Sequence, residues 1–268
     1  MTRVASAIVL VILLFATVWW LPWWATMLLA AIVAAQAAAE VAGLSTAAGA
    51  PVPAGTLAAG AAAIAFAFAI HDGSGTNGAD ALVPLVLAIV IGAGLVALAS
   101  GPPSPAAFTR AAVLVMGPLY VGLPIGTLAW IARSAGASAL TWLVVLIAAS
   151  DSAQYYTGRA FGRRKLAPVV SPAKTVEGAI GGVVIAALVA ALAGHWWLPR
   201  LSPVTTGLVG ILLAGFGMAG DLFESLLKRS AGVKDSATII PGHGGVLDRI
   251  DSYLFAAPVF YVFLRYLA

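Results

Sequence analysis

Apolar segments long enough to cross a lipid bilayer dominate this sequence. A bilayer core of about 30 Å is spanned by roughly 20 apolar residues in a helix. We expect about nine such helices, at roughly 4–20, 23–40, 52–70, 81–99, 111–133, 138–157, 176–195, 204–227 and 249–266. The chain is 62% hydrophobic and 9% charged, whereas a soluble domain carries about 25% charged residues. The sequence therefore predicts an all-α polytopic membrane protein.

Composition also excludes several kinds of chemistry. The chain has no cysteine, so a disulfide, a zinc–thiolate site and a thiol nucleophile are impossible. The net charge of +4 is small, which informs membrane topology and gives no reason to expect a nucleic-acid partner. The basic start of the chain resembles a signal peptide. Because the apolar run continues through Leu21 to Ala39 without a polar region, we expect retained membrane helices.

The charged residues are concentrated in two short segments. Sixteen of the 24 Asp, Glu, Lys and Arg residues lie within 151–177 and 221–251. We therefore divide the chain by expected role. Residues 1–137 are predicted to form N-terminal transmembrane helices that serve as scaffold and lipid-facing surface, and residues 138–268 a C-terminal catalytic region.

Asp221 lies within a predicted membrane helix. A carboxylate at that depth costs a few kcal/mol or more, so it usually faces a polar cavity, a partner or an ion. Asp221, Glu224, Ser225 and Lys228 share one helix face, because they are spaced at i, i+3, i+4 and i+7. Glu224 and Lys228 are spaced for an ion pair, which we interpret as structural.

Further carboxylates lie at the ends of other predicted helices. Acidic helix faces that meet near one membrane surface can bind a divalent cation through oxygen atoms, and Mg²⁺ suits a chain with no cysteine and three histidines. We expect Asp221 and Asp248 to be the principal metal ligands. Asp151 and Asp251 are the weaker candidates.

A glycine-rich stretch, "IIPGHGGVLDR", connects the last two predicted helices. Glycines permit left-handed backbone angles and expose N–H groups, and such turns can bind phosphate. Alone this pattern is weak, because most glycine-rich loops are only loops. Basic residues nearby favour the phosphate interpretation; these are Lys228, Arg229, Lys234 and Arg249. Acids for a metal and bases for phosphates together suggest nucleotide chemistry.

Two motifs give the chain a resemblance to a known family. The segment 225–251, here called the signature segment, is similar to the signature of the phosphatidate cytidylyltransferases, or CDP-diacylglycerol synthases. The matching residues are Ser225, Lys228, Arg229, Lys234, Asp235, Pro241, His243, Gly244, Gly245, Asp248, Arg249 and Asp251. Residues 151–182 resemble a second family motif, with Gln154 and Ala173 as departures that bear on substrate contacts. The resemblance covers roughly residues 150–255.

The resemblance implies that CTP and phosphatidic acid react to give CDP-diacylglycerol and pyrophosphate, with Mg²⁺ as cofactor. We expect Asp221, Lys228, Arg229, Asp248 and Arg249 to act in catalysis. The predicted substrate-binding residues are Ser171, Lys174, Thr175, Lys234, His243, Gly244 and Gly245. The family also implies a homodimer. Gly178 and Gly182 are spaced for close helix packing, within one subunit or between two.

Topology offers an independent argument about the site. Two predicted helices, 176–195 and 204–227, separate the two charged segments, so both segments should lie on the same side of the membrane. Both are basic, and Arg163, Arg164 and Lys165 fit the excess of positive charge in cytoplasmic loops. We expect a multi-pass protein of the cell inner (plasma) membrane, with the active site facing the cytoplasm and phosphatidic acid entering sideways from the lipid.

Two other functions stay open at this level. A related CTP-dependent lipid enzyme, such as a lipid-alcohol kinase or an archaeal-type CDP-lipid synthase, could use the same metal and basic residues. An ion-coupled transporter could use Asp151 and Asp221 as a cation site. Against the transporter, the charges cluster at one surface, and transport has no need of the glycine-rich stretch.

Overall fold

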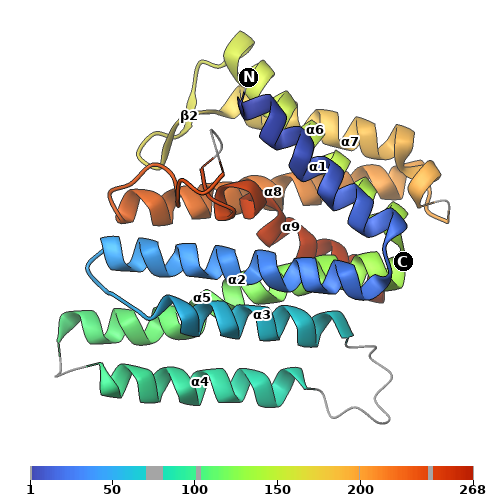
Figure 1. The fold of residues 1–268 in the computed structure, drawn as a ribbon. Helices are drawn as coiled ribbons and strands as arrows, with labels where there is room; N and C mark the ends of the chain where they lie inside the picture. Colours follow the sequence, from blue (N-terminus) through green and yellow to red (C-terminus); the bar gives the residue numbers. More distant parts are fainter. Residues whose placement is uncertain (1, 71–80, 101–103, 199, 241–243, 268) are drawn as a thin grey trace. The chain divides into compact units, whose positions relative to one another are not determined.

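The computed structural model describes residues 2–70, 81–100, 104–198, 200–240 and 244–267, with side chains from residue 8 onward. These ranges are almost entirely helical (Figure 1). The helices are α1 (Thr2–Trp20), α2 (Trp23–Ala47), α3 (Ala54–Ile70), α4 (Leu82–Ala99), α5 (Pro105–Trp130), α6 (Ala137–Phe161), α7 (Val176–Trp197), α8 (Pro203–Ser230) and α9 (Leu247–Tyr266). The predicted positions of the nine helices are confirmed, and the protein is an all-α polytopic membrane protein.

Six of the helices are long and apolar enough to cross a membrane. They are α2, α4, α5 with its π-helical continuation Ile131–Ala135, α6, α7 and α8. The 17 residues of α3 fall short of that length, and α1 has described side chains only from Ile8. The first turns of α9 carry Asp248, Arg249 and Asp251. Nine transmembrane helices therefore remain a prediction.

One element was not predicted. The segment between α6 and α7 forms an antiparallel β-hairpin of β1 (Lys165–Ala167) and β2 (Ser171–Thr175). Lys165 pairs with Thr175, and Ala167 pairs with Ser171. Strands of three and five residues are too short for an alternating hydrophobic pattern to be recognised. The hairpin fixes the residues immediately before α7.

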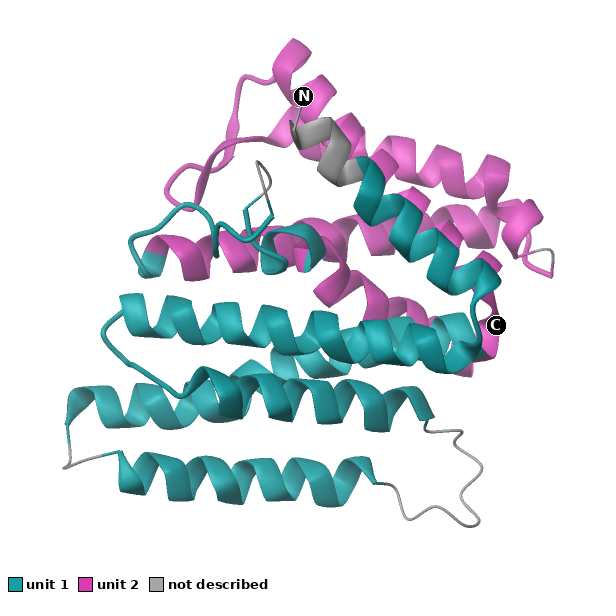
Figure 2. Ribbon diagram, viewed as in Figure 1, with its two compact units in different colours: residues 1–133, 230–250 teal, residues 134–229, 251–268 magenta. Residues whose placement is uncertain are grey.

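The chain divides into two compact units (Figure 2). Unit 1 contains residues 1–133 and 230–250, and unit 2 contains residues 134–229 and 251–268. Most of the signature segment thus packs with the N-terminal helices. The predicted division at residue 137 is one of function, and it stays a prediction.

Unit 1 is built around α2, α3 and α5, with α4 beside α3 and α5 (Figure 1). Helices α3 and α5 approach closely because glycines of α5 face α3. A Cβ at Gly122 would lie 2.7 Å from the Ala61 carbonyl oxygen, and one at Gly126 would lie 2.6 Å from the Phe68 Cβ. Met27, from α2, is among the buried side chains. Close backbone contact replaces large side chains here, as is common between membrane helices.

Unit 2 packs α6 against α7, α7 against α8, and α8 against α9. Glycines mark these crossings as well. A Cβ at Gly210 of α8 would lie 2.9 Å from the Ala186 carbonyl oxygen of α7, and one at Gly220 would lie 2.5 Å from the Asp251 carbonyl oxygen of α9. The tilted aromatic pair of Trp142 and Phe260 completes the core, with ring centroids 5.1 Å apart.

Candidate functional site

The hairpin of unit 2 carries a lysine to the acidic face of α8. Lys174 Nζ lies 2.6 Å from Asp221 Oδ2, and both side chains are partly exposed. The hydroxyl of Ser225, one turn further along α8, donates to Asp221 Oδ1 at 3.3 Å. Two residues predicted to bind substrate and metal from different segments are therefore in direct contact.

Asp151 of α6 and Asp251 of α9 belong to the same charged region of unit 2. Asp251 lies within electrostatic range of both Asp221 and Asp151. The Ser252 hydroxyl donates to Asp151 Oδ2 at 3.4 Å. Gly220 of α8 lets the backbone of α9 approach closely at Asp251. Three of the four predicted metal ligands thus lie in one charged region, on α6, α8 and α9, although no three carboxylates among the described residues are grouped as a metal site.

Glu224 and Lys228 form a buried ion pair on α8, as the i,i+4 spacing predicts. The Glu224 side chain is fully buried and that of Lys228 is 11% exposed. A buried carboxylate needs a compensating charge, and the lysine supplies it. The predicted ion pair is confirmed, whereas its structural role and a catalytic role for Lys228 both stay predictions.

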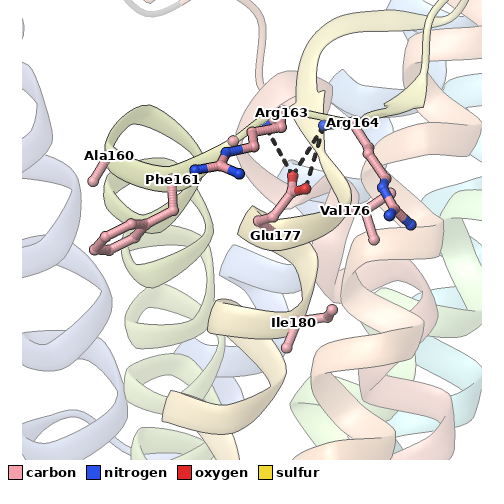
Figure 3. A pocket seen from close by; sticks show the side chains of 8 residues that line it. Ala160, Phe161, Arg163, Arg164, Val176, Glu177 and Ile180 are labelled. Carbon is pink, nitrogen blue, oxygen red and sulfur yellow. Dashed lines mark hydrogen bonds between the residues drawn. The ribbon is translucent and has the colours of Figure 1, made fainter.

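The base of the hairpin is fixed by two side chains at the start of α7. Thr175 Oγ1 accepts a hydrogen bond from the Gly178 N–H at 3.1 Å, the usual arrangement of a helix N-cap. The Glu177 carboxylate accepts the backbone N–H groups of Arg163 and Arg164, at 2.9 and 3.2 Å (Figure 3). Thr175 therefore has a structural function, and its predicted contact with substrate is untested.

A pocket of about 530 Å³ opens beside this base (Figure 3). Its lining combines apolar side chains, among them Phe161 and Ile180, with two arginines, Arg163 and Arg164. From the sequence we expect phosphatidic acid to enter sideways from the lipid, through an opening with Lys174 and Arg249 at its rim. The pocket is lined by other residues, so it does not test that prediction.

Gln154, one of the departures from the family motif, fits into unit 2 without displacing Asp151. Its Nε2 donates to Asp151 Oδ1 at 3.2 Å. Gly182 of α7 provides the space, because a Cβ there would collide with Gln154 Cγ. Gly178 likewise faces the Gln154 carbonyl oxygen, which would lie 2.7 Å from a Cβ at that position. These two glycines pack helices of one subunit, and the homodimer stays a prediction.

In unit 1, Asp248 organises the loop between α8 and α9. Its Oδ2 accepts the Gly245 N–H at 2.8 Å, the Ser236 N–H at 3.0 Å and the Ser236 hydroxyl at 2.9 Å. Gly244 has a φ of +80°, and a Cβ there would lie 2.6 Å from Asp248 Oδ2. In this structure the Gly245 amide thus contacts a carboxylate, and its predicted contact with phosphate is untested.

One residue that contacts the same loop, Glu40, is not among those predicted from the sequence. Glu40 of α2 is 4% exposed and accepts hydrogen bonds from Ser236, Val246 and Leu247. It lies within residues 1–137, for which the sequence predicts only scaffold and lipid-facing surface. The sequence did carry a signal for Glu40, because it is a charged residue within an otherwise apolar helix. Such residues usually have a functional partner.

The remaining predicted residues are surface groups or lie outside the described ranges. The side chains of Lys234, Arg229 and Arg249 are exposed. Ser171 is partly buried on β2. His243 lies outside the residues that the structure describes. The roles of all five stay predictions.

No three His, Asp or Glu side chains among the described residues form a ready-made metal cage. The charged region of unit 2 nevertheless suits a hard cation, since Asp151, Asp221 and Asp251 supply carboxylate oxygens, the ligands that Mg²⁺ prefers. Lys174 contacts one of these three acids directly. These oxygens are of the kind that Mg²⁺ prefers, and their binding of the predicted ion is untested.

Comparison with known proteins gives three informative relatives. The uncharacterized protein YnbB of Escherichia coli (strain K12) is 46% identical over 134 residues, 49% of this chain and 44% of the relative. A phosphatidate cytidylyltransferase of Haemophilus influenzae is 48% identical over 128 residues, 46% of this chain and 44% of the relative. A phosphatidate cytidylyltransferase of Bacillus subtilis is 44% identical over 129 residues, 48% of this chain and 48% of the relative.

These alignments span about half the length of the curated relatives. A broader match comes from a family model described as the cytidylyltransferase family, which fits residues 1–267. That match includes both the N-terminal helices and the signature segment. The chain therefore belongs to the cytidylyltransferase family.

Proposed function

We propose that this protein is a membrane cytidylyltransferase that converts CTP and phosphatidic acid into CDP-diacylglycerol and pyrophosphate. Relatives that are 44–48% identical over the aligned segments carry the name phosphatidate cytidylyltransferase. The observation that carries the proposal is the contact between Lys174 and Asp221, with Asp151 and Asp251 nearby. The Lys174 ammonium group, and a Mg²⁺ ion if these carboxylates hold one, would neutralise the repulsion between the two polyanionic substrates.

In this reaction an oxygen of the phosphatidic acid phosphate attacks the α-phosphorus of CTP. A new P–O bond forms. The bond between the α-phosphorus and the oxygen that bridges to the β-phosphate breaks, and its electron pair leaves with pyrophosphate. The attacking phosphate monoester is already ionised near neutral pH, so no general base is required. The protein must instead neutralise charge and align the two phosphates.

The residues of unit 2 support these two tasks. We propose that Asp221, with Asp151 and Asp251, holds Mg²⁺, which when bound neutralises charge on the phosphates. Lys174 reaches the same region from the hairpin, so its ammonium group is placed to contact a phosphate oxygen. Asp248, which the sequence predicts as a principal metal ligand together with Asp221, remains a further metal candidate.

In unit 1, the exposed side chains of Lys234 and Arg249 are proposed to bind the triphosphate of CTP. Arg229, at the end of α8 in unit 2, keeps its predicted role in catalysis. His243 is carried over from the family motif. For the whole protein we propose nine transmembrane helices in the inner (plasma) membrane, an active site facing the cytoplasm and a homodimer.

The test is product analysis with purified protein in lipid nanodiscs. CTP labelled in its α-phosphate is supplied with phosphatidic acid and Mg²⁺, and lipids are identified by mass spectrometry. We expect CDP-diacylglycerol and an equal amount of pyrophosphate. Asp221→Asn serves as the matched inactive control.

Other products would identify the competing functions. When a lipid alcohol replaces phosphatidic acid in the assay, formation of CDP and a phosphorylated lipid alcohol would show a kinase and would overturn the proposed transfer. Turnover only with an unsaturated ether-linked phosphatidic acid would show the archaeal-type substrate class. In sealed proteoliposomes, CTP-independent cation flux without any lipid product would favour a transporter.

A further inference from the structure

Glu40 is a carboxylate within α2, one of the candidate membrane spans. Its side chain is 4% exposed. Burying an ionised carboxylate costs several kcal/mol unless hydrogen bonds or opposite charges compensate. Its position in an alanine-rich helix is therefore not explained by packing, since an apolar side chain would fill the space at lower cost.

The compensation comes almost wholly from one loop. The Val246 N–H donates to Glu40 Oε1 at 2.9 Å, and the Leu247 N–H donates to Oε2 at 2.9 Å. The Ser236 hydroxyl lies 2.7 Å from Oε2. A fourth donor, Gln36 Nε2 at 3.2 Å from Oε1, comes from the preceding turn of α2. Among the described residues, three of the four donors thus belong to the chain leading into α9.

Two of these donors are backbone amides at the N-terminus of α9, which begins at Leu247. The first N–H groups of a helix have no partner within the helix and carry partial positive charge. A carboxylate from α2 therefore caps α9 from a position about 200 residues earlier in the sequence. It fixes where α9 begins, and α9 carries Asp248 and Arg249 in its first turn.

The same carboxylate explains why Gly245 is a glycine. A Cβ at Gly245 would collide with Glu40 Oε2 and with Ser236 Oγ. The φ of Gly245 is not in the left-handed region, whereas that of Gly244 is. Space for Glu40, not backbone conformation, is what Gly245 provides. Gly245 of the signature segment thus leaves room for Glu40, which lies far outside that segment.

Ser236 links the Glu40 carboxylate to that of Asp248. Its hydroxyl lies 2.7 Å from Glu40 Oε2 and 2.9 Å from Asp248 Oδ2. One hydroxyl hydrogen can serve only one of the two carboxylates at a time. The backbone amides therefore hold each carboxylate independently, and Ser236 connects them.

We propose that Glu40 is a positioning residue that holds the described part of the α8–α9 loop, with Asp248 and Arg249, in the geometry that binds the nucleotide. This role rests on the proposed function insofar as the ligand is CTP. The anchoring of the loop itself can be tested without any turnover.

The experiment compares Glu40→Gln and Glu40→Asp with the wild type in nanodiscs. Glutamine keeps the size but loses one acceptor and the charge, and aspartate keeps the charge on a shorter side chain. Hydrogen–deuterium exchange is followed in peptides that contain the Val246 and Leu247 amides. We expect about tenfold or faster exchange in Glu40→Gln, since charge-assisted hydrogen bonds are the strong ones, and partial protection in Glu40→Asp.

Kinetics provide the second readout. We expect Glu40→Gln to raise the apparent KM for CTP about tenfold, with the KM for phosphatidic acid unchanged. Thr46→Val is the matched control on the same helix, because the Thr46 hydroxyl donates within α2, to the Ala42 carbonyl. If Glu40→Gln does not fold, Ser236→Ala removes one donor and should shift exchange and KM in the same direction by a smaller factor.

Two results separate failure of this proposal from failure of the proposed function. Wild-type exchange and wild-type CTP kinetics in Glu40→Gln would overturn the positioning role while leaving the enzyme assignment intact. A wild type without CTP turnover would overturn the enzyme assignment. In that case faster exchange in Glu40→Gln would still support the anchor.

Discussion

Glu40 and Asp248 of unit 1 and the two acids on α8 of unit 2 are stabilised in different ways. Glu40 and Asp248 of unit 1 accept hydrogen bonds from backbone amides and the Ser236 hydroxyl. The α8 acids of unit 2 pair instead with lysine side chains, Asp221 with Lys174 and Glu224 with Lys228. Both arrangements compensate a carboxylate, but they constrain different parts of the chain.

The difference teaches what each set of charges can do. Backbone donors are fixed by the fold, so a carboxylate that they surround holds the main chain in place. An ammonium group on a flexible stem can exchange its partner for a phosphate oxygen with little change of backbone. Glu40 and Asp248 therefore shape a loop, whereas the Lys174–Asp221 pair presents charges that a ligand can rearrange.

The largest effect is expected at the buried pair of unit 2. Lys228→Met leaves Glu224 buried without its counter-charge, which should cost about 3–5 kcal/mol of unfolding free energy. Glu224→Gln combined with Lys228→Met should recover most of that loss, because the apolar or neutral pair needs no compensation. Reversible denaturation in mixed micelles measures both. Equal stability of the single and double variants would contradict the ion-pair account.

The next effect concerns the exchangeable charges. Asp221→Asn keeps size but removes the charge that contacts Lys174 and is proposed to bind Mg²⁺. We expect Mg²⁺-dependent turnover to fall about 100-fold, with no comparable change in melting temperature. Asp80→Asn, outside both charged segments, is the matched control. Near-normal activity of Asp221→Asn across a Mg²⁺ titration would remove Asp221 from the metal site.

Sequence was sufficient for the elements that follow from hydrophobic length and helix periodicity. The helices, the face shared by Asp221, Glu224 and Lys228, and the packing role of Gly178 and Gly182 all depend on local spacing. The β-hairpin was not predictable, because its strands are too short to show a pattern.

The anchor of the α8–α9 loop could not be predicted for a different reason. Glu40 and Val246 meet only in the folded chain, and a single sequence carries no pairing information over such a separation. Thr175 and Asp248 illustrate a related limit. Their residue types suit both substrate chemistry and local capping, and only the geometry shows the hydrogen bonds that they make.

A smaller effect is expected when the space between Gly245 and the Glu40 carboxylate is filled. Gly245→Ala would place a methyl group against Glu40 and Ser236, and overpacking of this kind costs about 1–3 kcal/mol. Gly43→Ala is the control on α2, because its Cβ would meet nothing within 4 Å. Alanine is the better helix former there by up to about 1 kcal/mol. In thermal unfolding in nanodiscs, we expect the melting temperature to fall for Gly245→Ala and to rise for Gly43→Ala.

The smallest effect lies in the more exposed pair of unit 2. The side chains of Lys174 and Asp221 are 19% and 29% exposed, against 11% and 0% for Lys228 and Glu224. Exposed pairs contribute about 0.2–1 kcal/mol in double-mutant cycles. We expect a coupling free energy in this range between Lys174→Met and Asp221→Asn, measured on stability.

The cycle at Lys228 and Glu224 provides the matched comparison, because its partners have the same chemistry and more complete burial. Its coupling should exceed the Lys174–Asp221 coupling several-fold. Equal coupling would mean that both pairs are structural, and that Lys174 is not available to exchange Asp221 for a phosphate. A weak Lys174–Asp221 coupling that disappears at high salt would instead support the exchangeable role, since a pair that a ligand can open must be easy to separate.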